Sequence, residues 1–416
     1  MAGKVAELPK GTRITDYISL GTIAEAIPIS KVRQVLKETG RESVRERELP
    51  AQVMVYYIIA MALYMQSSYR EVLRCLREGL IWLFGAEAAG KVAAKSAISQ
   101  ARSRLGVEPM RRLYQELVVP IATEKTKGAS YRKWRLVTLD GSTMDVADTE
   151  ANRKAFDGPS GSLGEGSYPQ LRTVSLVECG THVLFGAKLG GFRSGETVLA
   201  KEVIPGLKPG LLCIADRNFL GYELWKQAAE TGADLLWRGK KNLVLPCFQK
   251  FSDGSYLSRL YPSQKDRRRD RNGIAVRVIE YQVEGVDDSE PFHRLVTTIL
   301  SPEDAPALEL ANLIYRERWE IETALDELKT HLRGARIVLR SKTPEGVAQE
   351  FYGLLLAHFA IRGLMHEAAL SAEIDPDRLS FIHAVRVVRR KLPMFVAFSP
   401  GREEDFASGS FKGDFG

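Results

Sequence analysis

The chain has 416 residues, with 59 lysines and arginines against 52 aspartates and glutamates, so its formal net charge is +7. This excess favours a polyanionic partner over an acidic or neutral one. A hydrophobic content of 44% excludes wholesale disorder, and the length predicts two or three domains with a buried core. The most apolar run, residues 53–65, is shorter than the roughly 18–20 residues that span a bilayer, so it predicts a buried helix rather than a membrane segment.

The four cysteines are too scattered to predict a zinc site or a disulfide framework. They occupy positions 75, 179, 213 and 247. The first residues of the chain include no apolar segment that resembles a signal peptide. We therefore expect a cytoplasmic protein whose cysteines are reduced.

Residues 28–124 are rich in helix formers, and their apolar positions recur about every 3.6 residues, which predicts a helical N-terminal region. Within it, Lys95–Gly106 predicts a short helix that ends at Gly106 and carries Arg102 and Arg104. Two interpretations of this helix are open. Its charges belong either to a solvated face or to a DNA-contacting variant of the helix-turn-helix, because arginine and lysine bind phosphates.

From Lys133 onward the pattern changes to short β-rich runs. Strands are predicted at 135–141, 170–179, 181–191, 211–216 and 233–239. The second and third strands are separated by Gly180 alone and predict a hairpin, and helices are predicted at 197–204 and 222–232. The order β-β-β-α-β-α-β predicts an α/β sheet covered by helices, with the topology of a ribonuclease H-like fold.

A further β-rich region interrupts this scheme before the chain returns to helices. Its β-like segments lie at 242–248, 273–283 and 293–300, and it contains a basic loop, Gln264–Gly273, that includes Arg268. That loop is either simply solvated or in contact with phosphates. Helices are then predicted at 305–333, 344–369 and 381–392, and the tail after Pro400 is predicted to be disordered.

Two aspartates, Asp140 and Asp216, end predicted strands that would be neighbours in the sheet. Ligands often bind at such strand ends. Two nearby carboxylates repel each other unless a cation lies between them, and Mg²⁺ or Mn²⁺ prefers oxygen ligands. The pair alone leaves a second interpretation open, because aspartate at a strand end is also a common turn or cap residue.

A later helix carries four polar side chains on one face. At about 100° per residue, Tyr315, Arg318, Glu322 and Lys329 fall within roughly 60° of one another, beside the apolar stripe of the same helix. Helical geometry does not exclude Asp326 as a rival carboxylate. It also permits a plain amphipathic helix with surface charges.

These residues together resemble a known family. The spacing Tyr315-x2-Arg318-x3-Glu322-x6-Lys329 resembles the Y-R-E-K signature of the DDE transposases of the insertion-sequence "four" family. Asp140 in LDGST and Asp216 in ADRNF resemble the first and second aspartates of that family in order and context. A β-rich insertion between the second aspartate and the glutamate is a further similarity, over about residues 130–370.

The resemblance implies a site and a reaction. Asp140, Asp216 and Glu322 would be catalytic and would hold two Mg²⁺ ions, for which Mn²⁺ can substitute. The remaining signature residues, Tyr315, Arg318 and Lys329, would bind DNA phosphates near the cut and at a hairpin. Candidate DNA contacts of lower rank, chosen for their charge, are Arg102, Arg104, Arg217 and Arg268.

The reaction implied is cut-and-paste transposition of an insertion sequence, by phosphodiester hydrolysis, a hairpin intermediate and strand transfer. Its partners would be double-stranded DNA, namely the terminal inverted repeats and the target, and a second copy of the chain in a synaptic homodimer at the bacterial nucleoid. Two alternatives stay open: a catalytically inactive or domesticated DNA-binding protein, and a ribonuclease H-like nuclease with another substrate.

We expect six segments in the chain. They are a helical, DNA-end-binding domain (1–130), the first part of the core (131–238), a β-rich insertion (239–304), the core catalytic helix (305–340), C-terminal helices for dimerisation (341–399) and a disordered tail (400–416).

Several other motifs are not predicted to carry chemistry. Residues 85–92 fit the G-x4-G-K frame of a nucleotide-binding loop, but Val92 replaces the required Ser or Thr. His358 and His366 are predicted to be core or surface residues rather than metal ligands, and Trp237 and Trp319 to be packing residues rather than base-stacking ones.

Overall fold

The computed structural model describes residues 20–44, 49–74, 76, 93–159, 168–281, 293–334 and 337–390. Within these ranges, the side chains of 20–22, 314–319, 321, 387, 389 and 390 are outside the description. The chain divides into two compact units. Unit 1 contains the residues up to Leu117 and those from Glu327 onward, and unit 2 contains Val118–Asp326.

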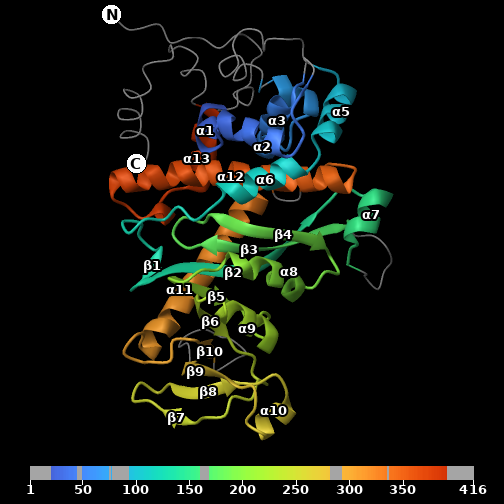
Figure 1. The fold of residues 1–416 in the computed structure, drawn as a ribbon. Helices are drawn as coiled ribbons and strands as arrows, with labels where there is room; N and C mark the ends of the chain where they lie inside the picture. Colours follow the sequence, from blue (N-terminus) through green and yellow to red (C-terminus); the bar gives the residue numbers. More distant parts are fainter. Residues whose placement is uncertain are drawn as a thin grey trace, which may run out of the picture. The chain divides into compact units, whose positions relative to one another are not determined.

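Unit 1 is built from helices (Figure 1). They are α1 (Leu20–Ala26), α2 (Ile29–Glu38), α3 (Ala51–Leu63), α5 (Lys95–Leu105), α6 (Glu108–Leu117), the π-helical η4 (Glu327–Leu332), α12 (Pro344–Ala372), the 3-10 turn η5 (Pro376–Arg378) and α13 (Phe381–Arg390). The buried helix predicted at 53–65 is confirmed, because α3 is almost wholly buried and packs against α12. The helix that starts at Lys95 is also confirmed, and it ends at Gly106, whose φ of 70° suits glycine.

Unit 2 contains one large sheet. Its strands are β1 (Ser130–Tyr131), β2 (Trp134–Asp145), β3 (Gln170–Glu178), β4 (Leu184–Gly191), β5 (Leu211–Ala215), β6 (Asp234–Arg238), β7 (Gln249–Lys250), β8 (Tyr256–Leu260), β9 (Ile274–Tyr281) and β10 (His293–Thr297). The order is β4-β3-β2-β5-β6-β10-β9-β8-β7, with β1 paired to β2. Only the β2–β5 and β5–β6 pairs are parallel. The first five strands in this order reproduce the predicted ribonuclease H-like topology.

Helices cover both faces of this sheet (Figure 1). The helices of unit 2 are α7 (Glu150–Phe156), α8 (Glu196–Val203) with the 3-10 turn η3 (Ile204–Gly206), α9 (Tyr222–Ala229), α10 (Gln264–Arg268) and α11 (Ala307–Asp326). Helix α8 packs on β3 and β4, whereas α11 packs on β2 and β9. The start of α11 shares a buried cluster with Leu136, Ile214, Leu236 and Leu295 from four neighbouring strands. The β-rich insertion therefore does not form a separate sheet, because β10 pairs with β6 and extends the core.

Three details differ from the sequence-based expectations. Residues 242–248 form no strand, and Pro246 within this run lacks the N–H that a ladder requires. Residues 179–183, not Gly180 alone, connect β3 to β4. The basic segment Gln264–Gly273 is not only a loop, since α10 occupies its first half and the Ser263 side chain caps that helix.

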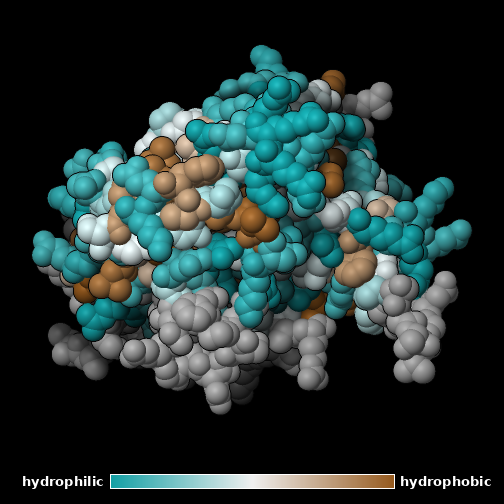
Figure 2. Space-filling model, turned by 90° about the horizontal axis from the view of Figure 1, so that it is seen from below, coloured by the Kyte–Doolittle hydropathy of each residue, from teal (hydrophilic) through white to brown (hydrophobic). Residues whose placement is uncertain are grey.

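Among the described helices, none combines the length and the apolar character of a membrane-spanning segment. Hydrophilic residues cover most of the molecular face seen in Figure 2, and the apolar residues there form separate patches. The same distribution follows from the sequence, where charged residues make up 27% of the chain.

A buried ion pair links η4 to α12 inside unit 1. The Glu327 carboxylate accepts hydrogen bonds from Nε and Nη2 of Arg362 at 2.8 and 2.7 Å. His358 Nε2 lies 3.3 Å from the same carboxylate, and burial lowers the pKa of His358 to about 3. The imidazole is therefore neutral at pH 7 and donates its Nε2 proton to Glu327.

We expect Arg362→Met to lower the free energy of unfolding by about 3–5 kcal/mol, because it leaves the Glu327 charge buried and unpaired. Urea unfolding followed by circular dichroism measures the loss. The control is Arg111→Met, which removes the exposed Arg111–Glu108 pair of α6 and should cost at most about 1 kcal/mol. Equal losses in the two variants would contradict a stabilising role for the buried pair.

Candidate active site

The three parallel strands stop pairing in a single row. That row consists of Leu139, Ala215 and Trp237. The next residues along the three strands are Asp140, Asp216 and Arg238. Asp140 does not end its strand as predicted, because β2 continues to Asp145 in its pairing with β3. It stands instead where the β2–β5 ladder ends, so the two aspartates still meet at one edge of the parallel segment.

Both aspartates lie on the sheet face that α11 covers. Side chains alternate along a strand, so Asp140 shares a face with Leu136, and Asp216 shares a face with Ile214. Leu136 and Ile214 both belong to the buried cluster that includes the start of α11. Helix α11 carries Glu322, whose side chain is exposed. The fold thus faces the two strand aspartates with the helix that bears the third predicted carboxylate.

The charges of both other predicted carboxylates act on Asp140. The pKa of Asp140 is raised from 3.8 to about 6, mainly by burial and then by the negative charges of Glu196, Asp216 and Glu322. One hydrogen bond opposes this shift, because the Gly141 N–H donates to Asp140 Oδ1 at 2.7 Å. A carboxylate whose proton affinity is raised by neighbouring negative charges is suited to bind a divalent cation.

Glu196 is an acidic neighbour that the sequence analysis missed. It begins α8, and a Cβ atom placed on Gly141 would lie only 3.0 Å from its carboxyl group. Arg172 Nη1 on β3 lies 3.5 Å from Glu196 Oε1. Gly141 follows Asp140 and therefore points to the other face of the sheet, so Glu196 lies behind Asp140. Acidic residues are common in the first turn of a helix, so nothing in the sequence distinguished this one.

Arg238 is the second neighbour that the sequence analysis missed. Its Nη1 lies 3.6 Å from Asp216 Oδ1, and its Nη2 lies 2.9 Å from Nδ1 of His293 on β10. This arginine therefore connects Asp216 to the first strand that the insertion adds to the core. One feature of the sequence could have identified Arg238. It ends a predicted strand that lies parallel to the strand before Asp216.

Of the other three signature residues, only Lys329 has a side chain in the described part of the structure. Tyr315 and Arg318 lie within α11, but their side chains are outside the described part of the structure. Lys329 is half-buried and lies in η4 of unit 1. The rival carboxylate Asp326 is exposed at the last residue of α11.

Arg102 was a wrong assignment among the candidate DNA contacts. Its side chain is only 7% exposed. Its guanidinium donates hydrogen bonds to Gln349 Oε1 and Ser341 Oγ and lies 3.5 Å from the Glu350 carboxylate. A group committed to these internal partners does not face a DNA backbone. The other three candidates, Arg104, Arg217 and Arg268, are exposed.

The motifs predicted to carry no chemistry are mostly packing residues. His358 and His366 are buried, and Trp237 is fully buried in an edge-to-face contact with Trp225. All three therefore lie in the core, which for Trp237 is the predicted packing role. Residues 85–92 and the Trp319 side chain lie outside the described part of the chain. The described cysteines 179, 213 and 247 are free thiols.

The donor set of the carboxylate cluster consists of oxygen atoms alone. Carboxylate oxygens suit Mg²⁺ and Mn²⁺, whereas zinc and copper sites recruit histidine or cysteine. Asp140 and Asp216 would supply donors from two neighbouring strands, and Glu322 would supply the third from the packed helix α11. The cluster therefore fits a divalent metal that prefers oxygen ligands.

Known proteins resemble the chain along most of its length. A family model described as Insertion element 4 transposase N-terminal matches residues 17–115, and one described as Transposase DDE domain matches residues 133–360. The Escherichia coli transposase InsG for insertion sequence element IS4 is 28% identical over 389 residues, 92% of this chain and 85% of that protein. The putative transposase InsZ of Escherichia coli is 24% identical over 215 residues, 51% of this chain and 69% of that protein.

One solved structure was also compared. The piggyBac transposase synaptic complex with hairpin DNA aligns with 95% of this chain and 85% of its own chain, at a TM-score of 0.47 and 11% sequence identity. The stretch matched by the DDE-domain model, more than half of the chain, includes Asp140, Asp216 and Glu322.

We expect Asp140→Asn to stabilise the protein in metal-free buffer by about 1–3 kcal/mol at pH 8. Because the pKa of Asp140 is raised to about 6 in the folded state, ionising this carboxyl group costs folding free energy above that pH. The gain should vanish as the pH falls from 6 towards 4, where the wild-type carboxyl group is protonated in the folded protein. Thermal unfolding in EDTA at each pH measures it.

The prediction has an internal control. Added Mg²⁺ should narrow the difference between the two proteins, because a metal stabilises the ionised carboxylates of the wild type and leaves the asparagine variant with fewer ligands. A stability difference that is the same at pH 4 and pH 8 would contradict the electrostatic account.

Proposed function

Because the chain belongs to the DDE transposases of the insertion element 4 family, we propose that it moves an insertion sequence by a cut-and-paste route through a hairpin intermediate. Enzymes of this class cleave DNA and transfer the cut strand with the help of a divalent metal. The observation that supports the proposal most is the row of Asp140 and Asp216 at the end of the β2–β5 ladder, on the face covered by the helix of Glu322.

In this proposal Asp140, Asp216 and Glu322 hold two Mg²⁺ ions. Bound there, such ions stabilise the attacking and leaving oxygens of a phosphodiester exchange. Asp140 has to lose its proton before it can serve as a ligand, because its pKa lies near 6 in the metal-free protein. Arg238 orients the Asp216 carboxylate through its 3.6 Å contact and adds a positive charge at the same edge.

The cationic residues of the signature would hold the DNA. Arg318 suits a bidentate contact to a phosphate, and Lys329 suits a single charged contact. Tyr315 would donate a hydrogen bond to a phosphate or support Arg318. Firmly held phosphates on both sides of the cut favour the sharp backbone bend that a hairpin requires.

The substrates would be the terminal inverted repeats of the element and a target duplex. The exposed Arg104 on α5, Arg217 after β5 and Arg268 on α10 would add phosphate contacts away from the cut. The N-terminal helices would bind the transposon ends, and the C-terminal helices would join two copies of the chain in a synaptic homodimer.

We expect Glu322→Gln to abolish cleavage while DNA binding and thermal stability are retained, because an exposed carboxylate is replaced by a neutral isostere that is a poor metal ligand. The assay uses a labelled duplex built from the inverted repeats, with purified protein and Mg²⁺. Mg²⁺-dependent nicking followed by a hairpin band in the wild type alone is the expected result. The matched control is Asp326→Asn, which should cleave as the wild type does.

Cleavage by Glu322→Gln together with no cleavage by Asp326→Asn would make Asp326 the third carboxylate. Binding without cleavage by the wild type, in Mg²⁺ and in Mn²⁺, would favour an inactive DNA-binding protein. Cleavage without strand-transfer product would favour a nuclease of another kind.

We expect Lys329→Ala to slow cleavage by about 10- to 100-fold, the loss typical of one charge-assisted contact, without changing the metal affinity of the site. Single-turnover cleavage at several Mg²⁺ concentrations separates the two quantities. A rise in the half-saturating Mg²⁺ concentration would contradict a phosphate-binding role for Lys329.

A further inference from the structure

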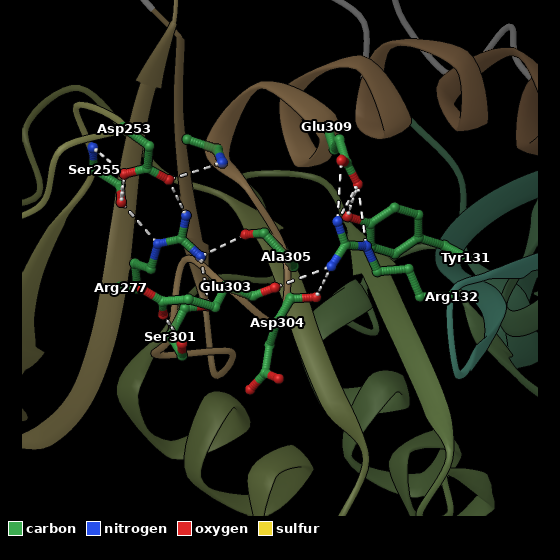
Figure 3. A network of polar contacts seen from close by, with 11 residues as sticks. Tyr131, Arg132, Asp253, Ser255, Arg277, Ser301, Glu303, Asp304, Ala305 and Glu309 are labelled. Atoms are coloured by element: carbon green, nitrogen blue, oxygen red, sulfur yellow. Dashed lines mark hydrogen bonds and ion pairs between the residues drawn. The ribbon is translucent and has the colours of Figure 1, made fainter.

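The insertion contacts the first turn of α11 directly. Asp253, in the turn between β7 and β8, accepts the Ala307 N–H on its Oδ2 atom at 3.0 Å (Figure 3). The first N–H groups of a helix lack partners within the helix, so a carboxylate at this place satisfies one of them and also opposes the positive end of the helix dipole. Asp253 precedes Ala307 by more than fifty residues in the sequence, so this cap is a tertiary contact.

Arg277 on β9 holds Asp253 in place. Its Nη2 atom donates to Asp253 Oδ2 at 2.6 Å, and its Nε donates to Ser255 Oγ at 2.8 Å. Ser255 Oγ in turn donates to Asp253 Oδ1 at 2.6 Å. The Arg277 side chain is completely buried, and burial lowers its pKa. A buried guanidinium is costly unless each donor finds an acceptor, so this geometry is closely defined.

Two arginines from different elements donate hydrogen bonds to the turn that precedes α11. Arg277 Nη1 donates to the carbonyl oxygens of Ser301 and Ala305 at 3.2 and 2.7 Å. Arg132, in the turn between β1 and β2, donates through Nη1 to the carbonyl oxygens of residues 303 and 304 at 3.1 and 2.8 Å. Figure 3 shows the two guanidinium groups on either side of this turn.

The β1–β2 hairpin also contacts α11 directly. Glu309, in the first turn of α11, accepts the Tyr131 hydroxyl at 2.6 Å and the Arg132 guanidinium at 3.0 and 3.2 Å. Arg132 and Glu309 are exposed and Tyr131 is half-buried, whereas the Arg277 side chain is completely buried. The start of α11 is thus fixed at two points. One is the β1–β2 hairpin of the core (the core hairpin), and the other is the insertion.

We propose that Asp253 and Arg277 are positioning residues that set the direction of α11 and so place Glu322 against Asp140 and Asp216. This inference rests on the proposed role of the three carboxylates. Glu322 lies roughly four turns beyond Ala307, about 22 Å along the helix, so a tilt of about 5° at the first turn displaces it by about 2 Å. Mg²⁺ requires oxygen ligands at about 2.0–2.1 Å in near-octahedral geometry, so such a displacement removes a ligand.

The test compares Arg277→Lys and Asp253→Asn with Glu280→Gln in the full-length chain. Lysine keeps the charge but loses the fork that binds several acceptors, and asparagine keeps the shape but loses the charge opposite Arg277. Glu280 pairs with Arg294 at 2.7 Å between β9 and β10 of the same insertion, without any part in the network at α11. Its variant therefore controls for general loosening of the insertion.

Three quantities are measured for each protein: Mn²⁺ affinity by electron paramagnetic resonance, the single-turnover rate of the first nick on prebound DNA against Mg²⁺ concentration, and the melting temperature. Arg277→Lys and Asp253→Asn should weaken Mn²⁺ binding and raise the half-saturating Mg²⁺ concentration by about 10- to 100-fold. Glu280→Gln should leave both within about 2-fold of the wild type.

Unchanged metal affinity in both network variants, even with a lower melting temperature, would overturn the proposal, because the network would then only stabilise the fold. If Arg277→Lys does not fold, the near-isosteric Asp253→Asn decides the question alone. A wild-type protein that binds Mn²⁺ but does not nick DNA would overturn the proposed function, while the Mn²⁺ comparison would still decide whether the network positions Glu322.

Discussion

The parallel pairing of β2 with β5 forces two like charges into one row, and much of unit 2 is arranged around that constraint. Because the ladder ends at Leu139 and Ala215, the next residues, Asp140 and Asp216, must lie side by side. The sheet cannot separate them without a shift in register, and a shift by one residue would turn every side chain of the strand to the opposite face. The repulsion is therefore built into the fold, and it adds to the larger effect of burial in raising the pKa of Asp140. A divalent cation is the partner that relieves it.

The third carboxylate is placed by a different kind of constraint. Helix α11 packs on the sheet through its early apolar residues, and its start is tied to the core hairpin by Arg132 and to the insertion by Asp253 and Arg277. The insertion is continuous with the core sheet, because β10 pairs with β6. A β-rich segment that the sequence presents as an interruption thus gives α11 one of its two anchors.

The sequence predicted what depends on local pattern. Alternation and composition located β2, β3, β5 and β6, and helical periodicity located α3 and α5. Two contextual aspartates and a spaced helix signature selected Asp140, Asp216 and Glu322, and the fold has the two aspartates in one row on the sheet face that α11 covers. The end of strand β2 was misplaced at Asp140, because the reach of β2 depends on its partner β3 and not on its own residues.

Residues whose role depends on distant partners were missed. Glu196, Arg238 and Arg277 are ordinary charged residues in their local contexts, and only the tertiary structure shows that they contact Gly141, Asp216 and the start of α11. Arg102 is the reverse case, because the sequence analysis assigned it to DNA binding and the structure shows that its partners are internal. Its place on a basic helix suggested DNA, but α12, more than two hundred residues later, supplies Gln349 and Glu350 as its partners.

The error at Arg102 does not weaken the inference of a polyanionic partner. Four arginines are buried in the described structure, namely Arg102, Arg277, Arg333 and Arg362. Three of them have a carboxylate beside them: Arg102 with Glu350, Arg277 with Asp253, and Arg362 with Glu327. These pairs cancel in the sum of charges, so none of the excess of +7 is consumed by them. The excess is carried by the remaining residues, and charged side chains are seldom fully buried unless they are paired. Burying three arginines beside carboxylates therefore leaves most of the positive excess at the surface, where it can attract DNA over long distances.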